Sequence, residues 1–98
     1  MKGSIENKYW SRSDGVTTMH LLADGHLLAT LLVDDHIVPF LPGQTWLWNK
    51  RLQRAYRYVQ GKQQYLSTFI AEHSKQHGVT QVRFAKDVYD YRIEALEF

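Results

Sequence analysis

Hydrophobic positions in residues 16–33 fall in two short runs on either side of Asp24-Gly25. An Asp-Gly pair supplies the positive φ angles that a two-residue type I′ turn requires, and the flanking threonines and valines favour strands. The pattern predicts a β-hairpin, with a helix as the alternative because leucine is a good helix former.

The preceding polar residues 1–15 are expected to form an N-terminal arm, in which Tyr9 and Trp10 could pack back on the sheet or contact a partner.

A second alternating segment follows residues 34–44, where two prolines, a glycine and two aspartates predict an irregular connection or a short helical turn. Beyond this connection, aromatic and β-branched residues alternate with polar ones, and Gln60-Gly61 interrupts the pattern. The alternation predicts three short antiparallel strands, at about residues 45–50, 53–59 and 62–66.

Helical spacing replaces the alternation immediately afterwards. Apolar side chains and one histidine recur at i, i+3, i+4 and i+7, namely at Leu66, Phe69, Ile70 and His73. Ser67 stands where an N-cap would stand, and Gly78 follows as a stop signal. We therefore expect an amphipathic helix of about ten residues, which buries its apolar stripe against one face of the three strands because neither element can bury its own.

The remaining pattern predicts a short strand at residues 79–84, a turn through residues 85–90, and a helical turn or extended tail at the end. The expected fold class is α+β, with a small antiparallel sheet made of the N-terminal hairpin and a three-stranded sheet, packed on one helix. Residues 16–98 are expected to form a single domain after the arm.

The composition agrees with a packed core. The chain has 98 residues, of which 44% are hydrophobic and 13% aromatic, so it has room for one domain and enough apolar surface to fold. Cysteine is absent, which excludes disulfides and thiolate zinc sites. We expect a soluble, cytoplasmic protein, since no apolar run is long enough for a membrane span or a signal peptide.

The charges are distributed unevenly. Residues 36–71 contain five cations and no carboxylate, whereas the other residues carry seven cations and ten carboxylates, which gives +5 against −3. Cations interleaved with aromatic rings are typical of nucleic-acid binding, because phosphates attract the cations and rings stack or wedge. With two cations near the C-terminus, the candidate binding residues are Trp46, Trp48, Lys50, Arg51, Arg54, Tyr56, Arg57, Tyr58, Lys62, Arg83 and Lys86. The alternative is that the rings are core and the arginines a solvated edge.

Strand alternation divides the middle strand of this segment between two faces. Arg54, Tyr56 and Tyr58 would lie on one face, and Ala55 and Arg57 on the other. The small Ala55 suits close packing of the helix, which would leave the Arg54 face for a partner. Arg57 does not fit this division cleanly.

From about residue 32 onwards the letters "VDDH…AYRY…GK…YLSTFIAEH…QVRFAKDVYDYRIEALEF" resemble the small phage and bacterial HNH homing-type endonucleases. The resemblance is to members with a three-stranded sheet like the plant ethylene-response-type DNA-binding domain. In that family a strand reading roughly Tyr-Leu-His-Arg leads into a helix, and a Val-(Asp or Asn)-His nuclease core follows. The letters that match are Tyr65, Leu66, Val82, Asp90, Arg92 and Leu96.

The departures from the family pattern remove its chemistry. Phe84 stands in the place of the catalytic histidine, Arg83 in that of the preceding Asp or Asn, and Ala95 in that of an asparagine. In the resembled chemistry a histidine acts as general base while oxygen or nitrogen ligands hold a divalent metal. Phenylalanine accepts no proton, and a cation repels a metal. The resemblance therefore implies that the fold ends in a degenerate ββα-like segment without catalytic residues, a metal site or a cofactor. In this segment Val82 and Leu96 are expected to be buried anchors.

The histidines are weak candidates for a metal site elsewhere. His73 and His77 are spaced i, i+4 as two zinc ligands would be, but the Glu of the metalloprotease motif is missing. The Asp34-Asp35-His36 run is more common as an acidic turn that caps the next segment than as a ligand cluster.

Two functions from different classes remain open. The first is a non-catalytic protein of phage or mobile-element origin that lays its three-stranded sheet in the major groove of double-stranded DNA. The second is a small phage inhibitor that binds a host or defence nuclease or polymerase complex, since a scaffold keeps its surface when its catalytic site decays. An active HNH endonuclease with displaced ligands is the least favoured alternative.

Overall fold

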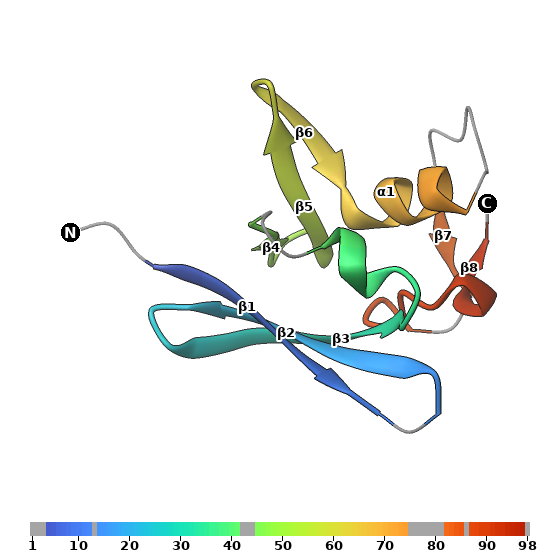
Figure 1. The fold of residues 1–98 in the computed structure, drawn as a ribbon. Helices are drawn as coiled ribbons and strands as arrows, with labels where there is room; N and C mark the ends of the chain where they lie inside the picture. The colour runs from blue at the N-terminus through green and yellow to red at the C-terminus, as the bar shows by residue number, and fades with distance from the viewer. Residues whose placement is uncertain (1–3, 13, 42–44, 75–81, 86, 98) are drawn as a thin grey trace.

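The computed structural model describes residues 4–12, 14–41, 45–74, 82–85 and 87–97. These residues form three small antiparallel sheets and an α-helix (Figure 1), which confirms the predicted α+β class. No helix in these ranges is long and apolar enough to cross a membrane.

Sheet A contains the predicted hairpin and one further strand. Strands β1 (Ile5–Ser11), β2 (Val16–Ala23) and β3 (His26–Asp34) pair in the order β1-β2-β3. Both turn residues between β2 and β3 have positive φ, 53° at Asp24 and 80° at Gly25, as a type I′ turn requires. The hairpin prediction is confirmed and the helical alternative is excluded.

Strand β1 lies within the segment that was expected to be a polar arm. It pairs with β2 along its whole length, with Tyr9 opposite Met19 and Lys8 opposite His20. Tyr9 packs against the core, whereas Trp10 on the other face has half of its surface exposed. The strand was missed because only alternate positions face the core, and one of these is the polar Asn7.

Sheet B contains the three strands predicted after residue 44, with slightly shorter bounds. They are β4 (Leu47–Asn49), β5 (Arg54–Val59) and β6 (Lys62–Tyr65), in the order β4-β5-β6. The β5–β6 turn has φ of 51° at Gln60 and 79° at Gly61, so it too uses two positive φ angles.

Helix α1 (Leu66–His73) follows β6 without a loop. Its N-cap is therefore Tyr65, which keeps extended backbone angles, and the prediction that Ser67 caps the helix is wrong. Ser67 lies inside the first turn and is buried. The helix ends at the Ser74 cap, and the predicted stop at Gly78 lies outside the described residues.

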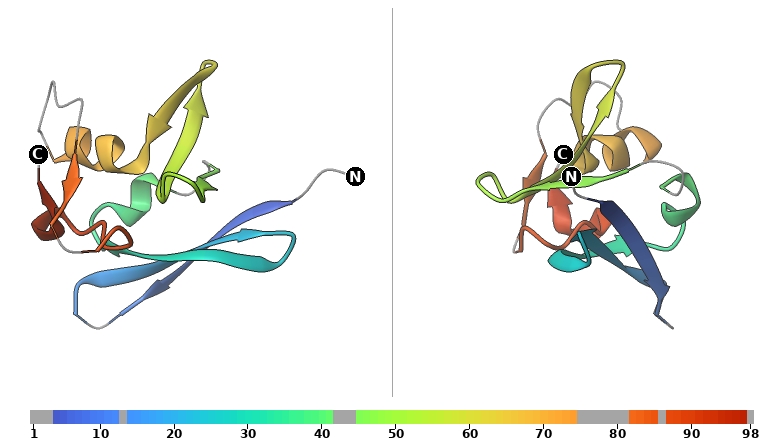
Figure 2. Two further views of the ribbon diagram at one scale, coloured as in Figure 1. Left: turned by 180° about the vertical axis from the view of Figure 1, so that it is seen from behind. Right: turned by 90° about the vertical axis from the view of Figure 1, so that its left-hand side faces the viewer.

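The core lies between sheet A on one side and sheet B with α1 on the other (Figures 1 and 2). The predicted stripe of α1 is buried at Leu66, Phe69 and Ile70, as expected for its packing on β5 and β6. Sheet A contributes a row of alternate side chains from β2 and β3. These are Met19, Leu21, Ala29, Leu31 and Val33.

An asparagine side chain joins the two layers. The Asn7 amide donates from Nδ2 to the Trp46 carbonyl oxygen at 2.9 Å, and its Oδ1 accepts from the Trp46 N–H at 2.7 Å. The Asn7 side chain thus makes the two hydrogen bonds to the Trp46 backbone that a residue of a neighbouring strand would make. Because Trp46 directly precedes β4, this contact fixes the start of sheet B over β1.

The C-terminal segment closes the other end of the core. Its elements are β7 (Arg83–Phe84), the 3₁₀ turn η2 (Ile93–Ala95) and β8 (Leu96–Glu97), with β7 antiparallel to β8. A further 3₁₀ turn, η1 (Val38–Phe40), lies in the connection between sheets A and B. The predicted strand at 79–84 is therefore a strand only at its end in the described part of the chain, and the predicted tail is a 3₁₀ turn followed by a strand.

Residues 89–91 lie along the outer edge of β3. The Leu32 N–H donates to the Tyr89 carbonyl at 3.0 Å, and the Leu32 carbonyl accepts from the Tyr91 N–H at 2.8 Å. This parallel bridge attaches the end of the chain to sheet A.

Candidate nucleic-acid interface

Sheet B presents one face to α1 and the core. Ala55 on this face is fully buried, which confirms that its small side chain admits the helix. Arg57 lies on the same face at its edge, where its guanidinium is 5.2 Å from the Trp46 ring centroid and 5.0 Å from that of Phe69. Its Nε also donates to Gln64 Oε1 at 2.8 Å. Arg57 is thus accommodated beside the core by cation–π contacts.

The opposite face of sheet B carries arginine and tyrosine. Arg54, Tyr56 and Tyr58 alternate along β5, and the Arg54 guanidinium is 5.3 Å from the ring centroids of both Tyr65 and Phe84. Tyr56 and Tyr58 meet edge to face at 5.7 Å. Burial, then the charge of Tyr58 and a hydrogen bond to it, raise the pKa of Tyr56, so this phenol is neutral at physiological pH. We call Arg54, Tyr56 and Tyr58 of β5, together with Gln63 and Tyr65 of β6, the outer face.

Exposed cations lie beyond both ends of β5. Lys50 and Arg51 occupy the turn between β4 and β5, where Asn49 Oδ1 accepts the Leu52 N–H at 3.0 Å and shapes the turn. Lys62 follows the turn between β5 and β6 opposite Val59, so it starts on the Arg57 side of the hairpin. The six residues of β5 separate these groups by roughly 20 Å at the usual strand rise. The hairpin β5–β6 projects away from sheet A (Figures 1 and 2), so its tip is accessible.

The structure does not bring all of the predicted binding residues together. Trp46 is fully buried and its backbone is held by Asn7, so it cannot contact a partner as predicted. Trp48 is half-buried and stacks on Tyr89 at 5.5 Å. Arg83 is exposed, but it lies on the separate β7–β8 sheet, and Lys86 lies outside the described residues.

One outer-face residue was missed from the sequence. Gln63 is exposed and lies directly opposite Tyr58 in the β5–β6 register. Gln63 has neither a charge nor a ring, so its residue type alone does not indicate nucleic-acid binding. The hairpin register would have found it, since the turn at Gln60-Gly61 fixes which residues face each other.

In the segment that resembles an HNH core, several side chains pack into the core of the protein. Val82 and Leu96 are buried, as expected for anchors. Phe84, in the place of the catalytic histidine, is half-buried and meets the Tyr91 ring edge to face at 4.9 Å. The hydroxyl of Tyr91 accepts the buried Ala55 N–H at 3.0 Å. These packing contacts and this hydrogen bond stabilise the fold.

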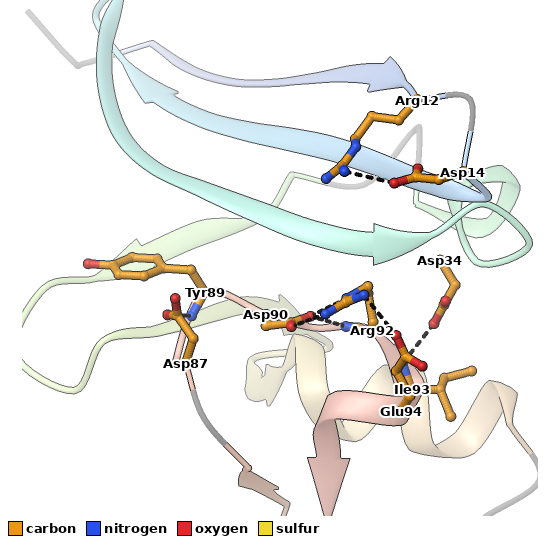
Figure 3. Close-up of polar contacts among 9 residues, drawn as sticks. All are labelled: Arg12, Asp14, Asp34, Asp87, Tyr89, Asp90, Arg92, Ile93 and Glu94. Atoms are coloured by element: carbon orange, nitrogen blue, oxygen red, sulfur yellow. Dashed lines mark hydrogen bonds and ion pairs between the residues drawn. The ribbon is translucent and has the colours of Figure 1, made fainter.

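A network of charges stabilises the same segment (Figure 3). Arg92 binds both carboxylate oxygens of Asp90, at 2.8 and 2.6 Å, and Glu94 Oε1 at 2.7 Å. The bidentate hydrogen bond to Asp90 is the main cause of a pKa of Arg92 above its ordinary value. Asp34 Oδ2 accepts the Ile93 N–H at 2.7 Å and so ties the network to β3. Asp90 and Arg92, two of the letters that match the family pattern, thus form an ion pair.

In the described part of the chain, His20 and His73 contact aromatic rings, and His26 and His36 are exposed. His73 lies 4.3 Å from the Phe69 ring and 4.6 Å from Phe40, and His20 lies 4.5 Å from Trp10. Across the residues that the structure describes, no group of three His, Cys, Asp or Glu side chains is placed to hold a metal ion. His77, the second residue of the i, i+4 pair, lies outside them.

Comparison of the chain with family models, with curated proteins and with solved structures gives no match.

Proposed function

We propose that this protein is a non-catalytic DNA-binding protein of phage or mobile-element origin, built on a scaffold related to the HNH endonucleases. The observation that supports this proposal is the outer face of sheet B. This face is not covered by α1, has exposed cations beyond both ends of β5, and lies in a stretch of 36 residues without a carboxylate, residues 36–71. Such a surface attracts a polyanion and offers rings and amides to its bases.

The proposed mode of binding places the β5–β6 hairpin in the major groove. A major groove about 12 Å wide admits a two-stranded ribbon, and the β5–β6 hairpin points away from sheet A (Figure 1). Lys50, Arg51 and Lys62 would contact phosphates, which positions the protein without reading sequence. Tyr58 and Gln63 would face base edges, and a glutamine can bind adenine through two hydrogen bonds.

Removing the three exposed cations is expected to weaken DNA binding and its salt dependence. Three phosphate contacts contribute about −2.7 to the slope of log K against log salt, so the Lys50→Ala/Arg51→Ala/Lys62→Ala variant should lose most of that slope. Fluorescence anisotropy of a labelled duplex, titrated at several salt concentrations, measures both quantities. Arg12→Ala, at an exposed cation just beyond β1, is the control and should bind as the unmodified protein does.

This experiment also tests the proposal as a whole. No binding to a duplex at about 50 mM salt and micromolar protein would exclude the DNA function, because non-specific binders reach roughly 10⁻⁴ to 10⁻⁶ M at higher salt. Binding that persists unchanged in the triple variant would move the interface away from sheet B.

Incubation with magnesium or manganese is expected to leave supercoiled plasmid DNA uncut. Phe84 cannot act as a general base, and Arg83 beside it repels a divalent cation. Gel electrophoresis of the plasmid after incubation with and without EDTA provides the measurement. Nicking that requires the metal and stops with EDTA would contradict the absence of catalysis.

A second candidate function is supported by sheet A. Its solvent-facing side exposes large apolar groups, Trp10 at 50% and Leu27 at 55%, which are typical of protein contacts. An inhibitor that binds a host or defence nuclease or polymerase complex would use such a surface. Loss of partner binding in Trp10→Ala, with DNA binding absent in the unmodified protein, would favour this function.

A further inference from the structure

Strand β1 has an open hydrogen-bonding edge. At its two ends, the Ser4 carbonyl accepts the Asp24 N–H at 2.7 Å and the Arg12 N–H donates to the Val16 carbonyl at 2.8 Å. Even-numbered residues of β1 therefore face β2, and the odd-numbered ones face away because backbone groups alternate along a strand. The outward-facing residues are Ile5, Asn7, Tyr9 and Ser11. Within the described part of the chain, no backbone group pairs with that edge.

The opposite edge of sheet A is protected, in contrast. Leu32 on β3 already bonds residues 89 and 91 of the C-terminal segment. Further along, Leu28 is left over between the pairs that Ala29 and Leu27 form with β2, which is a β-bulge. Bulges and covering segments prevent an edge strand from recruiting another strand. Among the residues that the structure describes, β1 has neither a bulge nor a covering segment.

The side chains of β1 are complementary to a second copy of themselves. Glu6 and Lys8 flank Asn7, and both are exposed on the solvent side of sheet A without a hydrogen bond or ion pair in the described structure. A two-fold rotation about Asn7 therefore places Glu6 of each strand opposite Lys8 of the other. We infer that β1 pairs antiparallel with β1 of a second copy, centred on Asn7, to give a symmetric dimer with a continuous six-stranded sheet.

This register uses every outward backbone group near the centre. Asn7 lies opposite its equivalent, and Ile5 lies opposite the partner subunit's Tyr9; each such pair exchanges two backbone hydrogen bonds. Glu6 lies directly opposite the partner subunit's Lys8, and the two-fold axis repeats this ion pair. A register centred on Lys8 would instead place the two lysines opposite each other, which destabilises a strand pair.

The dimer is expected to be weak and sensitive to salt. Strand pairing alone buries less than the roughly 1,200 Å² that stable interfaces need, and its ion pairs are exposed. Dimerisation does not require the DNA-binding function, since β1 and the outer face of sheet B belong to different sheets. Both are tested in separate measurements, so either can fail alone.

Charge reversal tests the register through the dimer dissociation constant. Glu6→Lys places like charges opposite each other twice, and should raise this constant on the order of tenfold or more at low salt. The double variant Glu6→Lys/Lys8→Glu restores both pairs and should dimerise as the unmodified protein does. An equimolar mixture of Glu6→Lys and Lys8→Glu should form the heterodimer in preference to either homodimer.

Analytical ultracentrifugation up to about 200 µM protein, chosen for a weak edge contact, gives the dimer constants, and native mass spectrometry identifies the heterodimer. Ile5→Pro is a second variant, because it removes an outward N–H and leaves the β1–β2 bonds intact; it too should weaken the dimer. A monomer under all these conditions would overturn the inference. So would a dimer that Glu6→Lys and Ile5→Pro leave unchanged, since it would form through another surface.

Discussion

Trp46→Ala is expected to destabilise the protein by about 3–5 kcal/mol, the usual cost of removing a large aromatic side chain from a core. Trp46 is fully buried, meets the Phe69 ring at 5.4 Å and lies beneath the Arg57 guanidinium. The substitution leaves a cavity and removes a ring on which a cation stacks. A small domain has only about 5–15 kcal/mol of stability, so much of the chain should be unfolded at moderate urea concentrations.

Trp46→Phe is the matched control for this prediction. The indole N–H of Trp46 has no hydrogen-bond partner in the described structure, so phenylalanine loses ring volume and no hydrogen bond. The backbone contacts with Asn7 are kept as well. Urea unfolding followed by circular dichroism should show a smaller loss than for Trp46→Ala, and DNA binding of the folded Trp46→Phe protein should stay unchanged. A Trp46→Ala protein with normal stability and no DNA binding would make Trp46 a contact residue after all.

Alkaline pH is expected to destabilise the protein between about pH 10 and 12. Burial raises the pKa of Tyr91 to about 12, although the Ala55 amide and Arg54 oppose the shift, and burial also raises the pKa of Tyr9 to about 12. Below pH 10 both phenols are protonated in the folded and unfolded chains, so the stability is complete. Above pH 10 the unfolded chain releases protons that the folded chain retains, so the free energy of unfolding falls as pH rises.

The expected loss from Tyr91 is about 2–3 kcal/mol at pH 12, because one pKa unit corresponds to about 1.4 kcal/mol. Urea unfolding at intervals between pH 8 and 12 measures it. Tyr91→Phe should be less stable at pH 8, by about 1–3 kcal/mol, because the Ala55 N–H loses its acceptor. Its stability should then fall less steeply with pH. Tyr58→Phe, at an exposed tyrosine, is the control, and a slope unaffected by Tyr91→Phe would contradict the assignment.

The sequence was sufficient to predict most of the elements and some of the site. Local rules identified two hairpins and one helix, because a turn such as Asp24-Gly25 and a stripe such as Leu66, Phe69 and Ile70 depend only on near neighbours. They also placed Ala55 correctly under the helix. The exposed cations of sheet B followed from the same reasoning, since Lys50 and Arg51 stand in a predicted turn.

Residues whose environment depends on distant parts of the chain were not predictable in this way. Alternation gives the two faces of a strand but does not say which one is covered. Trp46 and Tyr58 are both aromatic residues in the same basic segment, yet one is buried under Arg57 and the other is exposed. Trp46 owes its position to Asn7, which is 39 residues away and belongs to another sheet.

By itself, the sequence determined the α+β class, the positions of the turns, the apolar stripe of α1 and the basic, acid-free stretch of sheet B, because each depends on residue type and short spacing. Only the tertiary structure decided that β1 joins sheet A and leaves one edge open, that Arg57 lies against the core, and that residues 89–91 cover the edge of β3. These outcomes result from contacts between segments far apart in the chain, whose pairing is selected by packing of the whole core and not by local preference.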